Sequence, residues 1–116
     1  MMKIQQLAAE SVAIVLSGKN LTLVLQALWR QNPLLQSQQR GAIQDIVYGV
    51  LRYLGQLEVI LNQLVKQPLS DKKLRNLLLV SLYQLYYSES PEYAVVDCAV
   101  ATTRKLIKNK GAAGLV

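Results

Sequence analysis

Proline occurs at only three positions in this chain, 33, 68 and 91, and the segments between them carry the apolar spacing of amphipathic helices. Proline ends helices because it lacks an amide hydrogen and crowds the preceding turn. The sequence therefore predicts an all-α fold, a single compact bundle of about six helices. We expect these helices over residues 4–16, 21–31, 37–53 and 56–66, then from Ser70-Asp71 to about Tyr87, and from Ser90-Pro91 to Gly111 or Gly114.

Several residues predict where these helices begin and end. Gly18 suits a left-handed cap after the first helix. Ser37 is the expected N-cap of the third helix, and Ser70-Asp71 is the expected cap of the fifth. The fifth helix is apolar nearly all the way round, so we expect it to be the central and most buried one.

Gly49 lies inside the third predicted helix, within the stretch Tyr48-Gly49-Val50-Leu51-Arg52. Glycine in a helix interior is less favourable than alanine by about 1 kcal/mol. A close approach by another helix is the usual compensation for this cost. Gly49 is therefore predicted to be the point where the central fifth helix comes close, with Arg52 at the edge of the contact.

The composition argues against catalysis by this chain. Its 116 residues suit one domain, and the hydrophobic fraction of 52% predicts a well-packed core. Histidine is absent and Cys98 is the only cysteine, which removes Ser/His or Cys/His pairs, disulfides and a zinc site. Cys98 is expected to be a packing residue, and a single cysteine fits the cytoplasm. No apolar run approaches the ~20 residues of a membrane span.

The net charge of +6 indicates a polyanionic partner. Four of the 13 basic residues lie within Arg104–Lys110, with no acidic residue between them. This cluster is either a solvated helix end or a strip that binds phosphates. Arg75 lies in a second basic stretch with Lys72 and Lys73.

Six tyrosines and one tryptophan are the aromatic residues. Tyr83, Tyr86 and Tyr87 fall at helical spacing, which favours packing in or beside the core. Tyr48 and Tyr53 flank Arg52, and such a combination can stack and clamp unpaired RNA bases. The candidate RNA-binding residues are therefore Arg52, Arg75, Arg104, Lys105, Lys108, Lys110, Tyr48 and Tyr53.

Three segments in this order resemble the NusB-like N-terminal domain of the bacterial RsmB (Sun/Fmu) ribosomal RNA methyltransferases. They are Ile46-Val47-Tyr48-Gly49-Val50-Leu51-Arg52, Leu82-Tyr83-Gln84-Leu85-Tyr86-Tyr87 and Pro91-Glu92-Tyr93-Ala94-Val95. The resemblance covers nearly the whole chain and implies a NusB-like bundle of about six to seven helices. Gly114-Leu115-Val116 resembles the start of the segment that begins the family's last helix.

The resemblance implies an accessory role in RNA methylation. In the family this domain precedes a catalytic domain that transfers a methyl group from S-adenosylmethionine to carbon 5 of a cytosine in small-subunit ribosomal RNA. The expected partners are that RNA and the protein's own C-terminal methyltransferase domain. Residues 1–116 would then be a fragment without cofactor, metal or catalytic residues, and Cys98 would not be the family's nucleophile.

Departures from the family pattern leave alternatives open. Tyr93 replaces a histidine, Asp97 and Cys98 replace an Asn or Glu followed by Glu, and Gln5 and Gln6 lie where the first helix often carries arginine. One alternative is a module that docks on another protein or forms a homodimer without touching RNA. Another is a free-standing antitermination factor of the NusB type.

Overall fold

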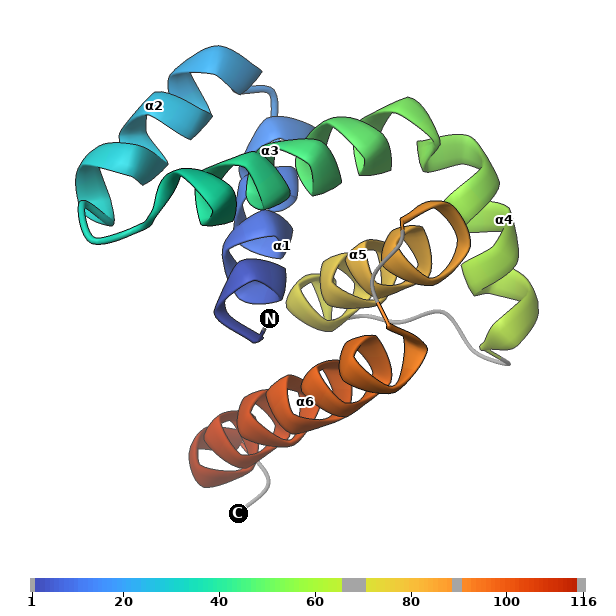
Figure 1. Cartoon of the computed structure of the whole chain (residues 1–116). Helices are drawn as coiled ribbons and strands as arrows, with labels where there is room; N and C mark the ends of the chain where they lie inside the picture. Colours follow the sequence, from blue (N-terminus) through green and yellow to red (C-terminus); the bar gives the residue numbers. More distant parts are fainter. Residues whose placement is uncertain (1, 66–70, 89–90, 115–116) are drawn as a thin grey trace.

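The computed structural model describes residues 2–65, 71–88 and 91–114, and side chains up to residue 104. These residues form six α-helices and no strand, which confirms the predicted all-α bundle (Figure 1). The helices are α1 (Met2–Leu16), α2 (Leu21–Gln31), α3 (Ser37–Arg52), α4 (Leu54–Leu64), α5 (Lys72–Tyr87) and α6 (Glu92–Gly114).

Helix α5 lies at the centre of the bundle, as the sequence predicts. Helices α1, α3, α4 and α6 all contact it, whereas α2 packs on α1 (Figure 1). Contact on several sides explains why α5 is apolar nearly all the way round. Its buried residues are Asn76, Leu77, Leu79, Val80, Ser81, Leu82, Tyr83 and Gln84.

The ends of the first five helices follow local chemistry. Gly18 adopts a φ of 110°, which confirms the predicted left-handed cap after α1. Asp71 accepts hydrogen bonds from the backbone N–H groups of Lys73 and Leu74, as expected of an N-cap. The prediction for Ser37 is wrong by one residue. Gln36 is the N-cap, and its own backbone N–H donates to the Gln39 side chain in a capping box.

Two other boundaries also differ from the prediction. Helix α3 ends at Arg52 and α4 already begins at Leu54, so that only Tyr53 separates them. Helix α6 continues through Gly111 to Gly114, because a single glycine weakens a helix without necessarily ending it. The Arg104–Lys110 cluster therefore lies before the last turn of α6. Several positions lie outside the described residues: the predicted cap Ser70, the predicted start of the sixth helix at Ser90, the predicted end of the fourth helix at Lys66, and Leu115 and Val116.

Gln5 joins three helices inside the bundle. Its side chain is fully buried, and its Nε2 donates to Oε1 of Gln84 at 2.8 Å and to the backbone carbonyl of Val95 at 3.2 Å. Hydrogen bonds of this kind offset the cost of burying a polar amide. Gln5 therefore ties α1 to α5 and α6, and this residue of the first helix does not face a partner.

Candidate nucleic-acid interface

The contact between α3 and α5 is built on Gly49. Gly49 is buried, and a Cβ atom on it would overlap the ring of Tyr83, at Cε1, Cζ and the hydroxyl oxygen. Only glycine leaves room for this ring against the α3 backbone. The predicted close approach of the fifth helix at Gly49 is confirmed, and the group that makes it is an aromatic side chain.

Tyr83 is held in this contact by a hydrogen bond. Its ring is buried, and its hydroxyl donates to Oδ2 of Asp45 at 3.2 Å. Burial raises the pKa of Tyr83 above its usual value, and the negative charge of Asp45 raises that pKa further. Tyr83 therefore stays neutral at physiological pH.

The raised pKa predicts a loss of stability in alkali. An unfolded tyrosine ionises near pH 10. Because the folded-state pKa of Tyr83 is higher, its contribution is complete below about pH 10 and is lost as pH rises through the folded value. Urea unfolding between about pH 8 and pH 11 should therefore show a steeper fall in unfolding free energy for the wild type than for Tyr83→Phe. Equal falls in the unfolding free energy of the two proteins would contradict the assignment of a raised pKa to Tyr83.

Three tyrosines, which we call the tyrosine cluster, meet where α3, α4 and α5 converge. The rings of Tyr53 and Tyr87 are stacked, with centroids 4.3 Å apart and planes 3° from parallel. The ring of Tyr83 lies 5.9 Å from that of Tyr87 at 24°. The Tyr87 hydroxyl donates to Oε1 of Gln56 at 2.6 Å. These contacts fix the cluster at the surface end of the α3–α5 interface.

The structure brings three of the predicted site residues together beside this cluster. The Arg52 guanidinium lies 5.5 Å from the ring centre of Tyr53. Arg52 itself is exposed, and Tyr48, four residues earlier in α3, is 47% exposed. Residues four apart in a helix are neighbours on its surface. Tyr48, Arg52 and Tyr53 therefore form one surface patch.

Tyr87 belongs to this patch, although the sequence indicated only a packing role for it. It is 41% exposed. Its four-residue spacing from Tyr83 was the available signal, because it places both rings on the face that meets α3. The packing prediction is wrong for Tyr86, which is 62% exposed.

The remaining predicted cations lie elsewhere. Arg75 is half-buried in the first turn of α5, about 18 Å along the helix axis from Tyr87 at 1.5 Å per residue. Arg104 is exposed on α6 and borders an apolar groove between α5 and α6 that includes Leu82 and Val100. Lys105, Lys108 and Lys110 belong to α6, but their side chains lie outside the described ones.

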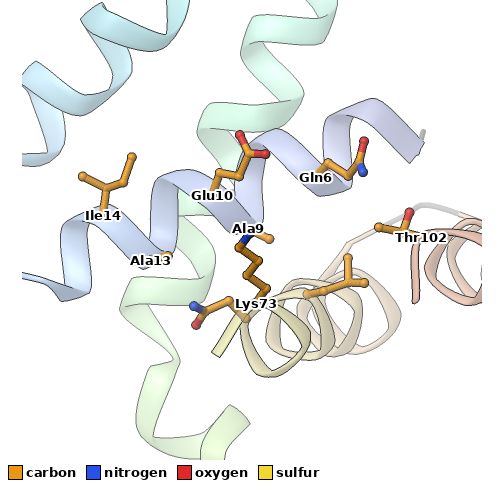
Figure 2. Close-up of a pocket in the computed structure, with 9 residues that line it drawn as sticks. Gln6, Ala9, Glu10, Ala13, Ile14, Lys73 and Thr102 are labelled. Atoms are coloured by element: carbon orange, nitrogen blue, oxygen red, sulfur yellow. The ribbon is translucent and has the colours of Figure 1, made fainter. Parts of the chain in front are cut away.

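A pocket of about 460 Å³ opens between α1, α5 and α6 (Figure 2). Lys73 extends from α5 toward Ala9 of α1, and Gln6 and Glu10 line the α1 side (Figure 2). The buried Asn76 and Thr102 complete the polar part of the wall. Because Lys73 and Glu10 carry opposite charges, this pocket lacks the uniformly positive lining of a phosphate site.

Cys98 agrees with its predicted packing role, and Trp29 also has a structural role. Cys98 is half-buried between the buried Val95 and Ala99. Trp29 packs against the core, and the Arg40 guanidinium lies 5.8 Å from its ring centre. Among the described residues, no three potential metal ligands lie together. No helix in the described ranges is long and apolar enough to cross a membrane.

Comparison with known proteins gives one family. The NusB family matches residues 2–116. Similar proteins include ribosomal RNA small subunit methyltransferase B of Pasteurella multocida, 39% identical over 103 residues, which are 86% of this chain and 22% of that protein. The same enzyme of Sodalis glossinidius is 39% identical over 109 residues, 88% of this chain and 24% of that protein.

The Cronobacter sakazakii enzyme of the same name is 33% identical over 112 residues, 90% of this chain and 25% of that protein. The chain thus spans about a quarter of the length of these relatives. The family match covers all six helices. The Gly49–Tyr83 contact joins two of the three segments that resemble the family. The chain therefore belongs to the NusB family.

Proposed function

We propose that this chain is the RNA-binding N-terminal domain of a small-subunit ribosomal RNA (cytosine-5) methyltransferase. The observation that carries the proposal is its similarity to enzymes named ribosomal RNA small subunit methyltransferase B, of which it covers about a quarter. In this proposal, S-adenosylmethionine binds to a catalytic domain outside these 116 residues. The chain itself would position ribosomal RNA, in the cytoplasm, for that domain.

The charge of the chain supports RNA as the partner. Basic residues exceed acidic ones by six, and neutralised phosphates supply most of the sequence-independent affinity for nucleic acid. Arg104 is exposed and free to meet a phosphate, and Arg75 is partly so. With Arg52 and the lysines at 105, 108 and 110, they make up the six cations that we assign to phosphate contacts. Neither the docking-only module nor the free-standing antitermination factor is favoured by the comparisons.

RNA affinity that comes from these phosphate contacts should depend steeply on salt concentration. Each phosphate neutralised on a single strand contributes about −0.7 to the slope of log affinity against log salt concentration, so six contacts predict a slope of about −4. Doubling the salt concentration should then weaken binding to a small-subunit ribosomal RNA fragment roughly 15-fold. Fluorescence anisotropy across a salt series measures this slope. A flat profile, or no binding at low salt, contradicts the proposal.

A further inference from the structure

The geometry of the tyrosine cluster points to a stacking platform for one unpaired RNA base, with the Arg52 guanidinium as its upper layer. This inference rests on the proposed function, since it names the kind of RNA that the patch around Arg52 would bind. It also adds Tyr87 to the residues that the interface needs.

The two tyrosine rings and the Arg52 guanidinium form ordered layers. Tyr53 and Tyr87 are parallel and 4.3 Å apart, so no space remains between them for another group. The Arg52 guanidinium, 5.5 Å from the Tyr53 ring centre, therefore covers the opposite face of Tyr53. The layers run from Tyr87 through Tyr53 to Arg52; the two outer layers, Tyr87 and Arg52, are exposed, and Tyr53 between them is half-buried.

The tyrosine layers are fixed before any ligand binds. Tyr87 is anchored to Gln56 by a 2.6 Å hydrogen bond, and Tyr83 beside it is anchored to Asp45. A guanidinium above an aromatic ring is held in place by cation–π attraction. Preordered side chains lose less conformational entropy on binding, which favours this patch over a flexible surface arginine.

The chemistry of the Arg52 side chain favours a nucleobase as the ligand. A planar guanidinium stacks on nucleobases, which an ammonium group does not reproduce. Tyr48 is a surface neighbour of Arg52 and can contact the edge or face of the same base.

The base that this platform binds must be unpaired. Both faces of a base inside a duplex are covered by its neighbours, so a platform of this kind can reach only bases in loops, bulges or single strands. A small surface patch with a single guanidinium on top takes one base. The ligand class is therefore RNA with at least one base free to leave its stack.

The test compares Arg52→Lys with Arg30→Lys in the 116-residue chain. Both changes keep the charge at an exposed arginine, but Arg30 lies on α2, away from the tyrosine cluster. The probes are a single-stranded RNA of about 12 nucleotides containing 2-aminopurine, and a duplex of the same sequence. Anisotropy gives the affinities, and quenching of the 2-aminopurine fluorescence reports stacking.

We expect Arg52→Lys to weaken single-strand binding by about tenfold, to reduce the quenching, and to leave duplex binding within about twofold. Arg30→Lys should change neither. The inference is overturned if Arg52→Lys binds the single strand as the wild type does, or if it loses single strand and duplex equally. In both cases a wild type that binds RNA with a steep salt slope leaves the proposed function standing. A wild type that binds no RNA overturns both.

Discussion

Replacing Gly49 with leucine should lower the free energy of unfolding by about 3 kcal/mol. A Cβ at this position would overlap the Tyr83 ring, which is buried, hydrogen-bonded to Asp45 and packed near Tyr87. The ring cannot move aside without breaking these contacts. Since small domains are stable by only about 5–15 kcal/mol, this loss is a large share of the total. Urea unfolding followed by circular dichroism measures it.

Gly41→Ala is the matched control for this change. Gly41 lies in the same helix, and a Cβ there would meet no atom within 4 Å. Alanine should therefore stabilise the chain, by up to about 1 kcal/mol. The milder Gly49→Ala adds a second comparison. It should destabilise the wild type, yet stabilise a Tyr83→Ala background, in which the obstructing ring is gone. A Gly49→Leu variant as stable as the wild type would refute this account of the interface.

The parts of the fold that local sequence determines could be predicted. Proline positions and helical periodicity indicated the all-α bundle, and Gly18 indicated the end of α1. Gly49 predicted a close helix contact because its cost in a helix interior requires compensation. The apolar circumference of α5 predicted its central place for the same kind of reason, since such a helix needs neighbours on several sides.

Helix boundaries that depend on tertiary packing were harder to predict from the sequence. The sequence does not show that Tyr53 alone separates α3 from α4, the helix that packs on α5. Gly111 indicated an end for α6, although the helix tolerates it. In the sequence, Gln5 stood out only as a residue at a place where the family's first helix often carries arginine. Its burial between α5 and α6 depends on partners 79 and 90 residues away.

In the candidate site, too, some contacts could be predicted from the sequence and others could not. Tyr48 and Arg52 are neighbours because they lie four residues apart in one helix, which sequence spacing reveals. The stacking of Tyr53 on Tyr87 joins residues 34 positions apart and requires the tertiary fold. The eight predicted residues also do not form a single cluster. Arg75 lies at the far end of α5 from the tyrosine cluster, and Arg104 lies on α6.

The assignment of the α6 cations to RNA can be tested by reversing their charge. Arg104→Glu/Lys105→Glu/Lys108→Glu removes three proposed phosphate contacts, each worth about 0.7 log units of affinity near 0.1 M salt, and adds repulsion. Affinity for the ribosomal RNA fragment should therefore fall by more than about 100-fold. Circular dichroism of the variant checks that α6 remains helical.

The matched control reverses three exposed cations elsewhere in the chain, Lys3→Glu/Lys19→Glu/Arg30→Glu, to which we assign no RNA contact. Both variants reduce the formal charge from +6 to zero, so a difference between them reports position rather than total charge. The most direct test of the RNA-binding account is therefore the affinity of these two variants for the same ribosomal RNA fragment, measured side by side. The account predicts a loss of more than about 100-fold for the α6 variant and less than about tenfold for the control. Equal affinities of the two variants would contradict it.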